Sequence, residues 1–340
     1  MRYYQTMNTI GRILRFTSFG ESHGVAVGGV LDGLPAGLRV DKERIRHALA
    51  RRAGRLLPAG FPAEEYENGL AMSQRACKEP DEVEFLSGLW DGVSLGTPIA
   101  FIIRNRDMRP EDYAALQDVF RPGHADLTYQ AKYGVRDPRG GGRASARETA
   151  ARVVAGTIAA QWLEMQGVKI SARVLEAGGE TEPERIRALI REVQTAGDSI
   201  GGIVGCTVSG LPVGTGEPLF DKLQARIACA VMSINACKGF DYGSGFEGRS
   251  RRGSELNPQS GGALGGISDG NNFTFRCVFK PTPSISLPQE ALCTDGSRTS
   301  IRIHGRHDVC VALRAPAVVE AMTALAVADL MMLQRAGSPN

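Results

Sequence analysis

The sequence predicts an α+β fold, and three observations support this. Five segments have the apolar spacing of helices, and six short runs rich in Val, Ile, Phe and Thr are typical of strands. The two kinds are mixed without strict β-α-β alternation, which disfavours a doubly wound parallel sheet. No repeat or low-complexity tract divides the 340 residues, so we expect a single domain over 1–340.

The expected helices begin and end at recognisable caps. Asp41 can cap a helix that runs to about Ala53 and closes at Gly54. A long helix with small and apolar residues at helical spacing is expected over 144–166, ending at Gly167. Three further helices are expected over 184–195, 218–234 and 316–335.

The expected strands lie between these helices, over 25–31, 83–89, 99–103, 203–208, 273–279 and 309–314. Two segments read as long mobile loops, 55–77 and 239–272. Loops of that length in a compact domain are usually functional or mobile.

Composition excludes several classes of protein. A net charge of +3 with interspersed signs gives no polycation stripe, so we expect no nucleic-acid partner. The C-terminal apolar stretch contains Glu320 and Asp329, which predicts a core helix and no membrane association. Residues 1–10 lack an apolar export signal, and the seven scattered cysteines fit reduced thiols, which together predict a cytoplasmic location and no structural metal site.

The first motif with chemical potential is Phe19-Gly-Glu-Ser-His-Gly24. It satisfies the G-x-S-x-G pattern of a serine hydrolase, but a strand pattern follows where that site needs a helix. Taken alone, the motif fits a tight glycine turn with a solvated histidine. Ser22 and His23 nevertheless lie between glycines, where backbone can approach a ligand.

The second motif is Arg121-Pro-Gly-His-Ala-Asp126, followed by the run Arg139-Gly-Gly-Gly-Arg-Ala-Ser-Ala-Arg147. Three glycines before a long helix can present free backbone N–H groups to an anion, and Arg143 and Arg147 add positive charge. A phosphate or carboxylate ligand is favoured over a solvated hinge. A third motif, Ile303-His-Gly-Arg-His-Asp308, places Arg306 and Asp308 on one face of an extended segment.

Seven blocks in order make the chain resemble the chorismate synthase family. They are F-G-E-S-H-G, R-P-G-H-A-D, G-G-G-R-A-S-A-R-E-T, M-S-I-N-A-C-K-G, L-G-G-I-S-D-G, K-P-T-P-S and G-R-H-D-V-C, and they span nearly the whole chain. The resemblance implies a β-α-β sandwich with a central helical layer between antiparallel sheets, assembled as a homotetramer. It also implies a lyase of the shikimate pathway and of aromatic amino acid biosynthesis. This lyase converts 5-enolpyruvylshikimate 3-phosphate to chorismate and phosphate by anti-1,4-elimination and requires reduced FMN, with NADPH as a candidate reductant.

The resemblance also implies roles for individual residues. His23 would donate a proton to the departing phosphate, His124 would stabilise the reduced flavin, and Asp308 would assist proton removal, with Ser22 and Ser145 as relay hydroxyls. Arg52 and Arg147 would bind substrate, and Arg55 would be the second arginine of that loop. The residues expected around the flavin are Arg143, Ala144, Ser145, Asn235, Ala236, Gly265, Lys280, Pro281, Thr282, Pro283, Ser284 and Arg306.

Two stretches depart from the family pattern: the segment 53–60, and a shortened loop between Gly253 and Gly261. Two other function classes stay open. One is a serine hydrolase that uses Ser22, which needs a histidine and an aspartate within reach of its hydroxyl. The other is a flavin- or anion-binding protein without turnover, which would not depend on His23 or His124.

Overall fold

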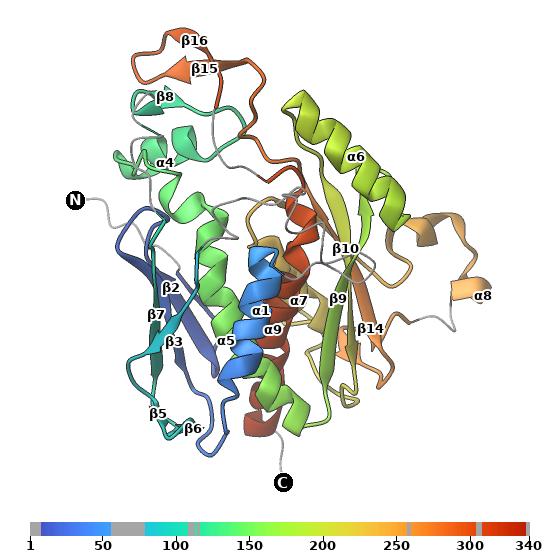
Figure 1. Cartoon of the computed structure of the whole chain (residues 1–340). Helices are drawn as coiled ribbons and strands as arrows, with labels where there is room; N and C mark the ends of the chain where they lie inside the picture. The colour runs from blue at the N-terminus through green and yellow to red at the C-terminus, as the bar shows by residue number, and fades with distance from the viewer. Residues whose placement is uncertain are drawn as a thin grey trace.

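The computed structural model describes residues 8–55, 79–107, 113, 116–256, 260–303 and 308–337. Two antiparallel sheets enclose a middle layer of helices, as Figure 1 shows. The sandwich predicted from the family resemblance is therefore confirmed.

The first sheet has the strand order β1-β2-β3-β7-β4, and the second has the order β11-β14-β10-β9. All neighbouring strands in both sheets pair antiparallel. The strands of the first sheet are β1 (Thr9–Ile10), β2 (Arg15–Phe19), β3 (Ala26–Asp32), β7 (Ile99–Arg104) and β4 (Val83–Phe85). Those of the second are β11 (Cys237–Tyr242), β14 (Phe273–Phe279), β10 (Gly202–Ser209) and β9 (Lys169–Ala177).

Smaller sheets lie outside these two layers. One has the order β16-β15-β8, and two hairpins pair β5 with β6 and β12 with β13. The strands are β16 (Arg298–Ile301), β15 (Gln289–Cys293), β8 (Val119–Phe120), β5 (Leu89–Trp90), β6 (Val93–Ser94), β12 (Ala263–Leu264) and β13 (Ile267–Ser268).

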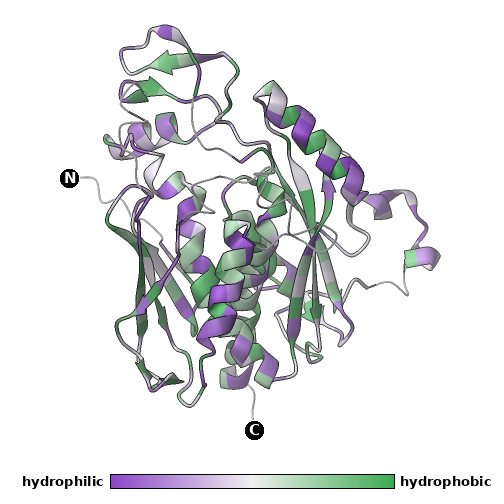
Figure 2. Ribbon diagram, in the orientation of Figure 1, coloured by the Kyte–Doolittle hydropathy of each residue, from purple (hydrophilic) through white to green (hydrophobic). Residues whose placement is uncertain are grey.

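The middle layer consists of α1 (Lys42–Ala53), α5 (Thr149–Met165), α7 (Leu223–Met232) and α9 (Ala315–Gly337). The hydropathy colouring of Figure 2 shows many apolar residues, in green, along these helices and along the strands of both sheets. α5 and α9 pack closely: a Cβ added at Gly156 of α5 would lie 2.3 Å from the Cα of Ala321 in α9. A glycine is therefore needed where the two backbones meet.

Helix α9 has the length and apolarity to cross a membrane, the one such helix among the described residues. Its apolar window is 89% buried inside the protein, which identifies it as the core helix predicted from Glu320 and Asp329. Asp329 is fully buried and accepts hydrogen bonds from the backbone N–H groups of Ile13 at 2.8 Å and Leu14 at 3.0 Å. It also accepts one from Arg226 at 2.8 Å, so α9 anchors the segment before β2.

The two caps predicted for the first helix, α1, are present in the structure. Asp41 accepts hydrogen bonds from the first turn of α1, and Gly54 ends that helix in the left-handed conformation. The other helices among the described residues are α4 (Asp126–Tyr133), α6 (Pro183–Ala196) and α8 (Gly253–Leu256). Helix α6 lies outside the second sheet (Figure 1).

Several predicted elements differ from the structure. The helix expected over 144–166 begins only at Thr149, because Ser145 has extended backbone angles and separates two short 3-10 turns, Gly142–Ala144 and Ala146–Glu148. The strand expected over 309–314 is wrong: the segment forms a 3-10 turn, Val311–Leu313, that leads into α9. The strand expected over 83–89 is divided into β4 and β5.

The two segments predicted as loops have different outcomes. Residues 56–78 lie outside the described residues. The segment 239–272 is not one loop, since it begins within β11 and contains a 3-10 turn (Gly245–Ser250), α8 and the β12-β13 hairpin.

Candidate active site

The candidate site is a cavity of about 430 Å³ at one edge of the helical layer. The C-terminal end of α1 meets the N-terminal ends of α5 and α9 there, as Figure 1 shows. The lining residues from the predicted set are Arg52, His124, Ala144, Ser145, Arg147, Asn235, Ala236, Lys280, Thr282, Pro283, Ser284 and Asp308. Segments far apart in the sequence thus supply one cavity with several cationic and few anionic side chains.

A run of glycines passes between the two predicted histidines. Gly140, Gly141 and Gly142 all have positive φ angles, of +62°, +86° and +53°. A Cβ at Gly140 would lie 2.2 Å from Cε1 of His23, and one at Gly141 would lie 2.4 Å from Cε1 of His124. Glycine is needed at both positions, because the backbone is left-handed there and no side-chain atom fits between it and the imidazole ring.

His23 is buried beneath this run and does not line the cavity itself. Its Nδ1 lies 3.0 Å from the Ser22 hydroxyl, and its ring meets Tyr113 edge to face with centroids 5.0 Å apart. Strand β3 follows this turn, where a hydrolase nucleophile requires a helix. The geometry therefore disfavours the serine-hydrolase reading.

His124 reaches the cavity from the turn before α4. Its Nδ1 lies 3.2 Å from an Asp126 carboxylate oxygen and 3.1 Å from Arg121 Nη2. Burial lowers the pKa of His124, the hydrogen bond to Asp126 opposes this, and the charges of Arg121 and Lys280 lower the pKa further. An anion bound in the cavity would shift the balance toward the imidazolium.

Asp126 holds this group together. Arg121 donates to it from Nε at 2.7 Å and from Nη2 at 2.8 Å, and both side chains are buried. Burial would raise the pKa of Asp126, but the hydrogen bonds from Arg121 and His124 outweigh it and hold that pKa well below its ordinary value. Asp126 is thus a carboxylate at neutral pH.

Two buried arginines form the opposite wall. Arg52 donates from Nε to Thr149 Oγ1 at 3.0 Å and from Nη2 to the carbonyl oxygen of Ala146 at 2.8 Å. Arg147 donates from Nε to Asn105 Oδ1 at 2.8 Å. Burial lowers the pKa of Arg52 to about 9, with the charges of Arg314 and Arg147 acting in the same direction. Asp81 and Asp308 oppose that shift.

Asp308 lies next to Arg314, just before α9. Arg314 Nη2 donates to Asp308 Oδ2 at 2.5 Å, and both side chains are buried and line the cavity. The pairing fixes one carboxylate oxygen of Asp308. It also places a carboxylate in a cavity that is otherwise rich in positive charge.

The wall built from 235–236 and 280–284 has the features of a ligand contact. Asn235 donates to the carbonyl oxygen of Ala144 at 3.0 Å, while its own Oδ1 is buried without a hydrogen-bond partner among the described residues. Ala236 has a φ of +66°, which is uncommon for a residue with a side chain and costs conformational energy. Lys280 Nζ donates to the carbonyl oxygen of Gly123 at 2.8 Å.

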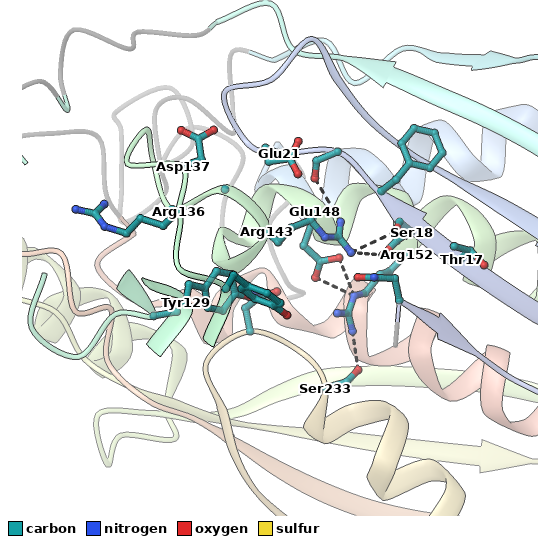
Figure 3. A pocket seen from close by; sticks show the side chains of 18 of the residues that line it. Thr17, Ser18, Glu21, Tyr129, Arg136, Asp137, Arg143, Glu148, Arg152 and Ser233 are labelled. Carbon is teal, nitrogen blue, oxygen red and sulfur yellow. Dashed lines mark hydrogen bonds and ion pairs between the residues drawn. The ribbon is translucent and has the colours of Figure 1, made fainter. Parts of the chain in front are cut away.

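A larger cavity of about 1270 Å³ lies beside this one and shares Ala125, Tyr129 and Asn235 with it. Figure 3 shows Arg143 pointing into it and donating to the hydroxyl of Ser18 at 2.6 Å. Arg143 therefore lines the neighbouring cavity and not the first one.

Six predicted residues are not in the first cavity. Ser22, His23, Arg55, Arg143, Pro281 and Gly265 do not line it, and Arg306 lies outside the described residues. Arg55 contacts the carbonyl oxygen of Pro80 at 3.5 Å, and Gly265 lies in the turn between β12 and β13.

The sequence reasoning also missed several lining residues, namely Glu79, Tyr113, Arg121, Tyr129 and Arg314. Arg121 stands at the start of a motif that had been singled out, so its signal was present. Glu79 follows a segment with no recognisable pattern, and it accepts hydrogen bonds from the backbone just after β7, a contact that only the fold reveals.

Comparison with known proteins identifies the family. The family model described as chorismate synthase matches residues 14–332. The chain belongs to the chorismate synthase family. It is 45% identical over 371 aligned positions to "Chorismate synthase" of Porphyromonas gingivalis, covering 97% of both chains, and 44% identical over 357 positions to that of Christiangramia forsetii, covering 95% of this chain and 96% of the relative. A solved structure, "Crystal Structure of Chorismate Synthase", matches with a TM-score of 0.70 and 29% identity over 97% of this chain and 94% of that one.

The family assignment confirms the resemblance drawn from the seven sequence blocks. It also agrees with the fold, because the solved member of the family superposes along nearly the whole length of the chain. The alignments with these relatives have more positions than the 340 residues of this chain, so the relatives carry insertions relative to it.

Proposed function

We propose that the protein converts 5-enolpyruvylshikimate 3-phosphate to chorismate and phosphate within the 430 Å³ cavity. This is the reaction of a carbon–oxygen lyase of the chorismate synthase family. The observation that carries this proposal is the convergence of Arg52, Arg147, His124 and Lys280 on one small cavity. The substrate has two carboxylates and a phosphate, and buried cations are the groups that bind such an anion.

Reduced FMN is the cofactor that we propose for this site. The hydrogen lost in the elimination is not acidic, and the electron-rich flavin ring would supply the negative charge that its removal requires. The residues present fit such a group. Asn235 Oδ1 has no partner among the described residues and can accept from a ring N–H, and Lys280 can pair with a phosphate. The strained Ala236 and the segment 280–284 would line its edge, and Arg143 would hold it from the neighbouring cavity.

The chain's own residues would manage protons and charge. On the family resemblance we assign His23, which lies behind Gly140 at the edge of the cavity, as the acid for the departing phosphate, with the Ser22 hydroxyl at 3.0 Å orienting its imidazole. His124, paired with Asp126, would be an imidazolium and would stabilise the negative charge of the reduced flavin. Asp308, held by Arg314, would accept a proton, with the Ser145 hydroxyl as a relay.

Arg52 and Arg147 would bind the anionic groups of the substrate. Both are buried at the end of α1 and in the turn before α5, so they act where water screens charge weakly. We extend the flavin contacts to Arg306 and Gly265, and the substrate contacts to Arg55, on the family resemblance alone.

The surroundings of the reaction follow from the same resemblance. We propose a homotetramer that works in the cytoplasm. The six cysteines that the structure describes are free thiols, and α9 is a core helix, which supports this location. NADPH is the candidate reductant, and replacing a chemical reductant by NADPH in the assay tests that role.

Substituting His124 by alanine tests the function. The lyase is expected to lose most of its chorismate formation while its circular dichroism spectrum and FMN binding persist. Unchanged turnover in this variant would contradict a catalytic role for the cavity. FMN binding without turnover in the unsubstituted protein would instead support a binding protein.

A further inference from the structure

The short segment before β4 carries two buried carboxylates, of which Glu79 lines the cavity and Asp81 does not. Glu79 is fully buried, lines the cavity and accepts hydrogen bonds from the backbone N–H groups of Arg106 at 3.1 Å and Asp107 at 3.2 Å. These contacts tie the segment to the backbone just after β7, which ends at Arg104. Asp81, two residues further on, is held at a fixed place behind the cavity wall.

Asp81 contacts both substrate-facing arginines of that wall. Its Oδ2 lies 3.5 Å from Arg52 Nη1, and its Oδ1 accepts a hydrogen bond from Arg147 Nη1. The side chain of Asp81 is 0% exposed, so both contacts form away from water. One carboxylate therefore serves as the shared counter-ion of two buried guanidinium groups.

The backbone at Asp81 is itself unusual. Its φ is +50°, in the left-handed region where residues with side chains are uncommon and where they cluster at functional sites. Aspartate and asparagine tolerate this conformation better than other side chains. The conformation aims the carboxylate between the two arginines.

The other hydrogen-bond partners that hold the arginines are neutral. Arg52 donates to Thr149 and to the Ala146 carbonyl, and Arg147 donates to Asn105. These groups orient the guanidinium planes, but none of them offsets the repulsion between the two positive charges. Without the carboxylate, two like charges would share one buried wall, and each would favour moving toward solvent.

We infer that Asp81 is a positioning residue that holds Arg52 and Arg147 side by side so that both face one anionic substrate. This inference rests on the proposed function, because that function supplies the anion. Arg52, Arg147 and Asp81 together carry a net charge of +1, which attracts the anionic ligand. Asp81 itself does not line the cavity, so it acts through the arginines.

The first test is Asp81→Asn, which keeps the shape of the side chain and its tolerance of the left-handed backbone. We expect the KM for 5-enolpyruvylshikimate 3-phosphate to rise about 30-fold while kcat changes little, since a contact that acts on substrate binding affects KM. Glu84→Gln is the matched control. It removes one negative charge three residues away, from an exposed ion pair with Arg104, and its KM should stay within twofold of the unsubstituted protein.

A pH profile distinguishes positioning from a general loss of structure. Arg52 must be protonated to bind an anion, and the groups that face it are Asp81, Arg147, Arg314 and Asp308. Asp81 raises the pKa of Arg52, so its removal lowers that pKa and moves the alkaline decline of kcat/KM to lower pH. A merely structural defect would reduce the amplitude of the profile without moving this decline.

Asp81→Glu covers the case in which Asp81→Asn does not fold. It keeps the charge but displaces the carboxylate oxygens, so we expect a raised KM with an unmoved alkaline decline. A folded Asp81→Asn, or failing that a folded Asp81→Glu, with a KM within twofold of the unsubstituted protein would overturn the inference.

A failure of the proposed function would be visible separately, as absent turnover in the unsubstituted protein. In that case calorimetry with 5-enolpyruvylshikimate 3-phosphate decides. A Kd about 30-fold weaker in Asp81→Asn supports the positioning role, and an equal Kd overturns it.

Discussion

Substituting Gly141 by alanine is expected to disable catalysis by displacing His124. The added Cβ would lie 2.4 Å from His124 Cε1 and 3.0 Å from Arg121 Nη2, whereas ordinary contacts begin at 3.4 Å. The imidazole must therefore retreat by about 1 Å, and a misplacement of this size costs about a hundredfold in rate. The positive φ of +86° adds a backbone cost of about 1 kcal/mol for any residue with a side chain.

Gly37→Ala is the matched control for the backbone cost. Gly37 has a φ of +90°, and a Cβ there would meet nothing within 4 Å. Both variants should lose about 1 kcal/mol of unfolding free energy from the backbone conformation. Only Gly141→Ala should also lose chorismate formation.

The assay is anaerobic chorismate formation with reduced FMN, run beside urea denaturation of each variant. A Gly141→Ala protein with kcat within twofold of the unsubstituted chain would refute the argument that this glycine run sets the position of His124. Equal activity losses in both variants would show that backbone strain, and not the contact with the ring, is responsible.

Three further predictions concern other contacts. Asp126→Asn removes the charged hydrogen-bond partner that raises the pKa of His124, so an NMR titration should show a lower pKa for this imidazole. As the pH rises, activity that needs the imidazolium should therefore be lost at a lower pH than in the unsubstituted protein. An unmoved titration would contradict this. Gly156→Ala should destabilise the protein by about 2 kcal/mol through overpacking against Ala321, seen as a lowered Tm, and an unchanged Tm would show that α5 and α9 can separate at no cost. Asp329→Asn should lower the free energy of unfolding by about 3 kcal/mol, because buried N–H donors and Arg226 lose an anionic acceptor, and an unchanged urea midpoint would argue against the anchor.

Local signals in the sequence were enough for most of the central elements. The two ends of α1 were predictable from Asp41 and Gly54. A side-chain acceptor at the first turn and a left-handed glycine after the last turn both act on backbone groups only a few residues away. The strand expected over 273–279 agrees with β14 because alternating Phe side chains leave no competing pattern. The arrangement of two sheets around a helical layer came from the family resemblance, since the pairing of β10 with β14 joins residues about seventy positions apart.

The errors occurred where backbone geometry depends on distant contacts. The start of α5 was placed too early because nothing local shows that Ser145 adopts an extended conformation and separates two 3-10 turns. The segment after Asp308 has the composition of a strand, yet it turns into α9 because the buried pair of Asp308 and Arg314 closes it back on itself.

The candidate site shows the same division. Motifs located His124, Asn235 and Lys280, and the structure brings them to one cavity. Asp81 carried no local signal, because its importance lies in two arginines that are distant in the sequence.

The most direct test of the account follows both products of the reaction together. Phosphate release and chorismate absorbance are measured anaerobically with 5-enolpyruvylshikimate 3-phosphate and chemically reduced FMN. We expect both products to appear in equal amounts with reduced FMN and neither to appear with oxidised FMN. Phosphate release without chorismate, or no turnover by a folded protein that binds FMN, would contradict it.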